Sequence, residues 1–128
     1  VHDIVFENIR AEYGEVSYPM VYQYTDEQEY PGASADYMPL LIMNAVYYSE
    51  VYSSPGERRG KIRDITFRDI SVTAPRMPPS LFSGFNPEYG VENVTVSGLR
   101  LNGQPVSGME QANFEVRDFV KNLRVEQE

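Results

Sequence analysis

The sequence predicts an all-β fold and, within that class, a parallel β-helix, a solenoid in which the short strands of successive coils lie on one another. One observation is an internal repeat with five apolar positions, found in three copies: Val1, Ile4, Phe6, Ile9 and Ala11; Ile62, Ile65, Phe67, Ile70 and Val72; Val91, Val94, Val96, Leu99 and Leu101. A second is the alternation of apolar and polar residues in short bursts, which is a strand signal. A third is that no helical segment separates these strands, which excludes a βαβ arrangement.

The spacing of the copies predicts how many coils the chain contains. The copies begin at positions 1, 62 and 91. A step from 62 to 91 suits one stacked unit, whereas the step from 1 to 62 is about two. We therefore expect an intermediate unit, part of which would be the apolar run 39–48. A fourth, degenerate copy matches the second half of the template, with Leu123 aligned to Leu99: Val120, Asn122, Leu123 and Val125. The prediction is a partial solenoid of about four to five coils, a single β-helix domain or fragment over residues 1–128.

The first half of the chain contains three predicted strand segments. Residues 1–13 alternate in two bursts, Ile4/Phe6 and Ile9/Ala11, whose break of register indicates a strand, a corner and a second strand. A short strand at 17–24 is entered through a proline, and a turn-forming acidic loop occupies 25–36. Length alone does not separate a buried strand from a helical turn at 38–48. Its β-prone neighbours favour a strand there, and 49–60 has loop chemistry.

The second half begins with the repeat copy at 61–72. Four prolines in the segment 73–89 exclude a regular helix there, although a short strand fits residues 80–85. The third copy ends at Asn102-Gly103, a dipeptide that favours tight turns. Both a hairpin and a corner between consecutive strands fit this turn, because Pro105 would remove a hydrogen-bond donor from a returning strand.

Two polar slots recur within the template. Asp64 and Asp69 occupy them in the second copy, and Asp3, Asn8, Asn93 and Gly98 occupy them in the others. Identical positions in successive coils lie about 4.8 Å apart, so these side chains can hydrogen-bond along a ladder. The other interpretation is that they are surface acids beside a strand.

Composition excludes several classes of function. A formal charge of −8 argues against nucleic acid as a partner, because that binding depends on clustered Lys and Arg. No apolar run approaches the roughly 20 residues of a membrane-spanning helix. The absence of cysteine excludes disulfides and cysteine zinc sites, and no pattern indicates a metal or another cofactor. The single histidine, His2, lies beside the first residue and is given no role.

Four strings carry a resemblance to a known family: DIVFENIR, PMVYQY, KIRDITFRDISV and VENVTVSGLRLNG. Together they resemble the C-terminal coils of polygalacturonase-like glycoside hydrolases, of the pectin-lyase-like superfamily of right-handed parallel β-helices. The resemblance covers most of the chain. It implies a right-handed parallel β-helix, a pectin-type polysaccharide or oligosaccharide as partner, and a secreted or periplasmic location.

The resemblance also implies where the chemistry lies. The family hydrolyses glycosidic bonds with a cluster of carboxylates, and its motifs are Asn-x-Asp, Asp-Asp, Gly-His-Gly and Arg-x-Lys. The first three have no match here, so we expect no catalytic residue in this chain and place the catalytic set before residue 1. Arg59-Gly60-Lys61 matches the fourth motif, which makes Arg59 and Lys61 candidate substrate contacts. A charged loop leading into a strand explains the same three residues.

Tyr18 is the main candidate for a substrate contact. It falls where family members have a tyrosine that lines the sugar site, although an aromatic ring stacked between coils would also explain it. A non-catalytic β-solenoid with a binding or structural role is the alternative function. In either case we expect self-association through the exposed coil at Val1, because an unpaired strand edge invites pairing with another chain.

Overall fold

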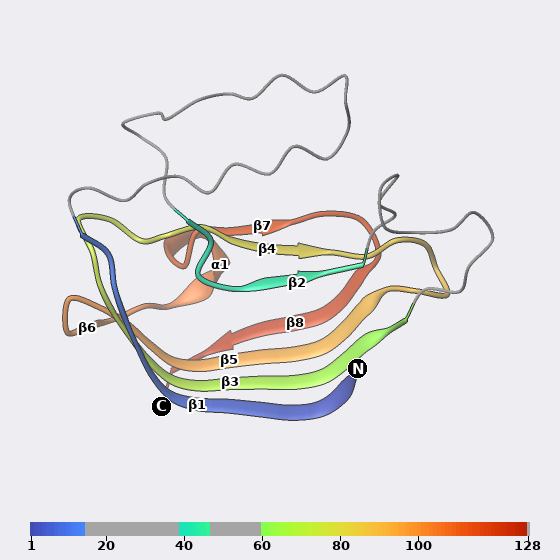
Figure 1. The fold of residues 1–128 in the computed structure, drawn as a ribbon, viewed down its shortest axis with the longest axis horizontal. Coiled ribbons are helices and arrows are strands. Elements are labelled where there is room, and N and C mark those ends of the chain that lie inside the picture. The colour runs from blue at the N-terminus through green and yellow to red at the C-terminus, as the bar shows by residue number, and fades with distance from the viewer. Residues whose placement is uncertain (15–38, 47–59, 128) are drawn as a thin grey trace, which may run out of the picture.

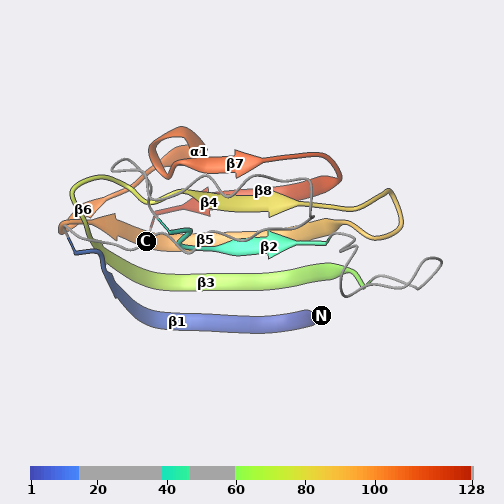
Figure 2. The same ribbon diagram turned by 45° about the horizontal axis from the view of Figure 1, so that its top comes forward.

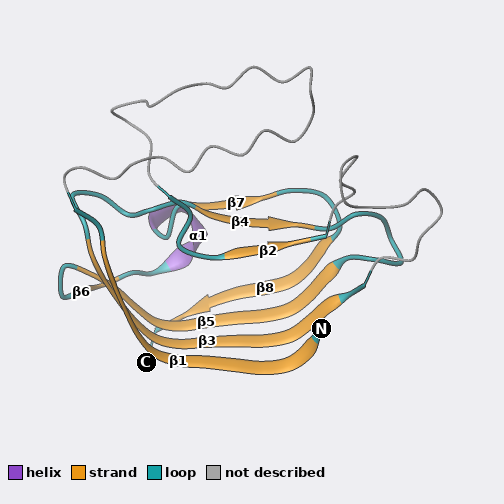
Figure 3. Ribbon diagram, in the orientation of Figure 1, coloured by secondary structure: helices purple, strands orange, loops and turns teal. Residues whose placement is uncertain are grey.

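The fold is all-β and consists of two sheets whose strands are mostly parallel (Figure 1). The computed structural model describes residues 1–14, 39–46 and 60–127. The larger sheet contains β1 (His2–Glu12), β3 (Ile62–Thr73), β5 (Val91–Leu101), β8 (Val120–Glu126) and the short β6 (Gln104–Pro105). The smaller sheet contains β2 (Met43–Ala45), β4 (Ser80–Ser83) and β7 (Phe114–Val116). In the described part of the chain, the one helix is α1 (Gly108–Gln111) (Figure 3).

The chain passes alternately through the two sheets. From β3 it crosses to β4, returns to β5, and reaches β7 and then β8 by way of β6 and α1. Each strand pairs in parallel with the strand of the previous pass, except that β6 is antiparallel to β5. We call one pass through both sheets a layer, and Figure 2 shows the layers stacked in the same order in both sheets.

The strand register confirms that the three copies of the template are equivalent. Ile4 pairs with Ile65, which pairs with Val94, and the same holds for the four other apolar positions of the second and third copies. Inward residues of neighbouring layers therefore stack on like residues. This repetition explains how a short sequence pattern, used three times, builds a continuous core.

The expected intermediate unit is wrong. His2 pairs directly with Arg63, so β1 and β3 are hydrogen-bonded neighbours despite the long stretch of sequence between them. The run 39–48 does contain the strand we expected, but this strand, β2, belongs to the smaller sheet and pairs with β4. The described strands therefore form three layers and the first strand of a fourth. No layer lies between β1 and β3, where the predicted count of coils included one.

The alignment of the fourth copy is also wrong. In β8, Val120 pairs with Val91 and Leu123 with Val94, so the segment repeats the first half of the template and not the second. The two halves of the template resemble each other, since Asp64-Ile65 and Asp69-Ile70 each precede a polar and then an apolar residue. Short sequence comparison could therefore align either half, and the hydrogen-bond register decides between them.

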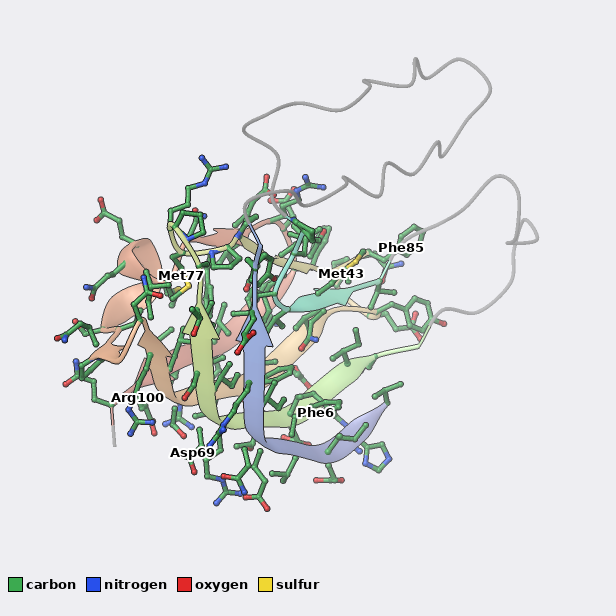
Figure 4. The ribbon with its side chains drawn as sticks, turned by 60° about the vertical axis from the view of Figure 1, so that its left-hand side comes forward. Phe6, Met43, Asp69, Met77, Phe85 and Arg100 are labelled. Carbon is green, nitrogen blue, oxygen red and sulfur yellow. The ribbon has the colours of Figure 1, made fainter. Side chains whose placement is uncertain are left out.

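The long strands of the larger sheet bend at the second polar slot. Asn8, Asp69 and Gly98 occupy this slot in β1, β3 and β5, and all three have positive φ, between 56° and 67°. The strands bend together in Figure 1, and Figure 4 shows Asp69 at the bend of β3. The corner predicted for residues 1–13 is thus a left-handed residue inside a strand that continues on both sides of it.

The core lies between the two sheets and is best protected in the second and third layers. In the described part of the chain, fifteen buried hydrophobic residues form one cluster, which includes Ile65, Phe82 and Val94. Burial decreases towards β1, where the Phe6 side chain is 43% exposed while its equivalent Phe67 is 7% exposed. The two rings are stacked with their centroids 5.1 Å apart, and Figure 4 labels Phe6 on β1. The apolar side chains of each layer are therefore buried by the neighbouring layers.

The turn after β5 is a hairpin, which settles the choice left open by the sequence. Asn102 and Gly103 both have positive φ, and β6 pairs back onto the end of β5. The Asn102 side chain also bonds to both backbone groups of Ala74 in the previous layer, at 2.8 and 3.1 Å. Pro105 is tolerated because β6 is very short and the next amide, that of Val106, donates to Leu99.

Candidate functional site

Only one of the three predicted substrate contacts lies in the described part of the chain. Tyr18 and Arg59 lie outside the described residues, as do the predicted strand 17–24 and the loop 25–36. Lys61 is described and exposed, and it directly precedes β3. Its carbonyl oxygen accepts a hydrogen bond from the amino group of Val1 at 2.9 Å.

Lys61 lines a pocket of about 280 Å³ where β5 and β8 begin. We call it the lysine pocket and define it by its lining residues: Lys61, Pro87, Gly90, Val91, Glu92, Phe119 and Lys121. Lys121 pairs with Glu92 across β8 and β5. The sequence contains only two lysines, and both line this pocket. Sequence reasoning found Lys61 but missed Lys121. The one signal for Lys121 is that it is the only other lysine in the sequence.

Phe119 has an unusual backbone conformation. Nine described residues other than glycine have positive φ, and eight of them are Asp or Asn, whereas the ninth is Phe119 with φ of 62°. A bulky residue in this region costs about 1–3 kcal/mol, so the surroundings must hold it there. Two hydrogen bonds do so: the Val91 amide donates to the Phe119 carbonyl at 3.0 Å, and the Gly84 amide donates to the Asp118 carbonyl at 2.8 Å.

Two glycines make room for this turn. A Cβ atom at Gly84 would lie 2.4 Å from the Phe119 carbonyl oxygen, and one at Gly90 would lie 2.7 Å from it. Both distances are far inside van der Waals contact with backbone, which cannot move aside easily. Gly84 and Gly90 therefore allow the turn before β8 to lie directly on the previous layer, and this places Phe119 in the wall of the lysine pocket.

The loop that carries Pro87 is closed by its own hydrogen bonds. The Asn86 side-chain oxygen accepts from the amides of Glu88 and Tyr89 at 3.0 and 2.7 Å. The Phe85 amide donates to the Tyr89 carbonyl at 2.8 Å. This compact turn fixes one wall of the pocket, since such side-chain to backbone bonds replace the ladder bonds that a loop lacks.

A second surface feature is a shallow groove of about 560 Å³ over the larger sheet. It is lined by the first polar slot of all four long strands together with outward residues of three of them: Asp3, Asp64, Asn93, Asn122, Val5, Thr66 and Arg124. Asn122 donates to Asn93 at 2.8 Å, and Asn93 donates to Asp64 at 3.1 Å. The ladder expected from the repeat is therefore present across β8, β5 and β3.

The carboxylates of this groove already have partners. The Arg63 side chain donates to Asp64, and the His2 ring bonds to Asp3. The hydrogen bond from Arg63, followed by that from Asn93, lowers the pKa of Asp64 below its ordinary value. Asp64 is therefore ionised at neutral pH and unsuited to protonating a leaving group. Among residues 1–14, 39–46 and 60–127, no group of three or more His, Cys, Asp or Glu could hold a metal ion.

The helix in the described part of the chain is too short to cross a membrane. Comparison with known proteins found no match for the chain, whether among protein-family models, curated proteins or solved structures.

Proposed function

We propose that this chain forms a right-handed parallel β-helix of the pectin-lyase-like superfamily and is the C-terminal portion of a polygalacturonase-like glycoside hydrolase. The observation that carries the proposal is the register of the repeat, in which equivalent apolar residues of β1, β3 and β5 pair in parallel. Stacked layers of this kind, with Asn and Asp side chains bonded from layer to layer, support a solenoid. The four strings that resemble the family support the glycosidase.

In this proposal the protein is secreted or periplasmic, and the chain acts on a pectin-type polysaccharide as part of an enzyme that carries its catalytic carboxylates elsewhere. Its own role is that of a scaffold with substrate contacts. Tyr18 remains the proposed contact from the family pattern, with Arg59 and Lys61 as weaker ones. The alternative is a non-catalytic β-solenoid with a carbohydrate-binding, structural or interaction role, and the hydrogen-bonded state of Asp3 and Asp64 is compatible with it.

The test is an assay of the purified chain on polygalacturonate, combined with calorimetric titration of oligogalacturonate. We expect no release of reducing ends, and binding that is lost in Tyr18→Ala but kept in the matched variant Tyr22→Ala. Hydrolysis by the chain alone would disprove that its catalytic set lies elsewhere. Equal binding by both variants would favour the alternative function over the hydrolase.

We also propose that the protein self-associates through β1 with a second copy. Phe6 is 43% exposed and Val5 is 52% exposed, although the Phe6 ring lies on the core side against Phe67. In the described structure β1 pairs with β3 along one edge only. A free edge with apolar residues is a template for strand pairing, and the β1 edge of a second copy offers the same backbone groups and the same side chains.

A further inference from the structure

We propose that the lysine pocket binds a carboxylated sugar unit, with the carboxylate between Lys61 and Lys121 and the sugar ring against Phe119. This rests on the proposed function, which names Lys61 as a substrate contact, and deepens it by adding Lys121, Phe119 and Glu92 to the same binding site.

The charge of the pocket favours an anion. The chain has a formal charge of −8, yet its only two lysines line one pocket of about 280 Å³. Salt bridges in the described part of the chain involve arginines and His2, while Lys61 and Lys121 have no carboxylate partner there. Two cations with one carboxylate, Glu92, leave the pocket positive in an otherwise acidic protein, and such a cleft concentrates anions.

The ring of Phe119 supplies an apolar wall. Its side chain is 42% exposed, although the backbone is strained and held by bonds to the neighbouring layer. The strained residue is therefore not one that the core has fully buried. Backbone strain that surrounding contacts maintain tends to occur at binding and active sites. An exposed aromatic face beside Pro87 is suited to the C–H face of a sugar ring.

Glu92 and the pocket volume further restrict which ligands fit the pocket. A carboxylate among the lining residues repels a simple anion but accepts hydrogen bonds from hydroxyl groups. The volume lies just below the range of about 300–1,000 Å³ that is usual for small-molecule pockets, which suits one sugar ring. Phosphate or acetate would use the lysines and leave Phe119 and Glu92 without a contact. A sugar acid uses all four side chains.

The presence of only two lysines allows a direct test. Reductive methylation with ¹³C-formaldehyde keeps the lysine charge and places NMR labels on Lys61, Lys121 and the amino terminus. We expect galacturonate to shift both lysine signals in a saturable manner, and galactose and inorganic phosphate at equal concentration to shift neither appreciably. Equal shifts with phosphate, or none with galacturonate, would overturn the proposal.

Variants separate the pocket from a general charge effect. Lys121→Gln should weaken galacturonate binding at least about tenfold, while Arg124→Gln, which removes a cation further along the same strand, should leave it unchanged. Phe119→Asn should also weaken binding, and it should fold, because Asn accepts positive φ. Wild-type binding by Lys121→Gln or by folded Phe119→Asn would contradict the assignment. Because hydrolysis is not measured, failure here is distinct from failure of the proposed function.

Discussion

The polar slots of the template are occupied by the residues that best tolerate a left-handed backbone. Asp3, Asp64, Asn93 and Asn122 share one slot, all with φ between 54° and 56°. Gly98 replaces Asp69 in the second slot, where only the backbone conformation is common to both. The two aspartates of the second copy are thus explained by the backbone, because Asp, Asn and Gly adopt positive φ more readily than other residues.

Asn93 tests the separate contributions of backbone and ladder. Asn93→Ala should lower the free energy of unfolding by about 1–2 kcal/mol from the left-handed backbone, and by a further amount from the lost bonds to Asp64 and Asn122. Asn93→Gly loses the same bonds without the backbone penalty and should be the more stable of the two. Urea denaturation measures both. Equal stability would show that φ at this slot does not matter.

Asp64 gives the ladder a pH dependence. Its pKa is lowered first by the hydrogen bond from Arg63, so the folded state favours the ionised form. This contribution is complete above the ordinary pKa of about 4 and is lost as pH falls through the lower folded value. The melting temperature of the wild type relative to Asp64→Asn should therefore decrease over that acidic range.

Arg63→Gln is the matched variant for this titration. Without the guanidinium, the pKa of Asp64 moves back towards its ordinary value, so the stabilising effect of ionisation should be smaller and its loss should be complete at a higher pH than in the wild type. A wild-type difference from Asp64→Asn that does not change with pH would contradict the assigned role of Asp64.

At the scale of elements, each strand is stabilised by the layers on either side of it. Ile70 in β3 is 1% exposed between β1 and β5, whereas its equivalent Ile9 in β1 is only partly buried. The sequence pattern treats these two positions alike. Their difference in burial follows from position in the stack, which no local pattern contains.

The same substitution at two equivalent positions measures this effect. Ile70→Ala should cost about 2–5 kcal/mol, the range for a buried aliphatic side chain. Ile9→Ala should cost clearly less, because part of its side chain is already in contact with solvent. Denaturant midpoints of the two variants provide the comparison, and an equal loss would show that β1 is as well covered as β3.

Self-association through β1 is tested by placing a charged side chain on the core-facing side of this strand. Phe6→Glu should shift the protein towards monomer in light scattering across a concentration series, because a carboxylate at the edge opposes apolar contact with a second copy. Val116→Glu, at an exposed position of β7, is the control and should leave the association unchanged. A wild-type protein that is monomeric at every concentration would refute the proposed association.

At the scale of the whole molecule, sequence reasoning identified the all-β class, the equivalence of three copies and the strands near 43–45 and 80–83. It failed where chain length was used to count layers. The first layer is long because a long stretch of chain separates β1 from its neighbour β3, and long insertions between paired strands add little to the entropy of closing a loop. Spacing is thus a poor measure of the number of layers.

The lysine pocket could be predicted only in part for a similar reason. Lys61 could be found through a short motif, but Lys121 and Phe119 join it only because β3 pairs with β5 and β5 pairs with β8. Phenylalanine rarely adopts positive φ, so residue propensities would not have predicted the conformation of Phe119. Close contact at Gly84 and Gly90 decides that conformation, and this contact exists only in the stacked structure.

The central claim is that strands stack with equivalent residues of the template adjacent to one another. Because the chain has no cysteine, paired substitutions can be oxidised without interference. Thr95→Cys with Arg124→Cys joins residues paired between β5 and β8, and parallel neighbours lie within reach of a disulfide. We predict rapid cross-linking of this pair and none for Arg100→Cys with Arg124→Cys, the pair that an alignment of Leu123 with Leu99 would join. The reverse result would contradict the layered register.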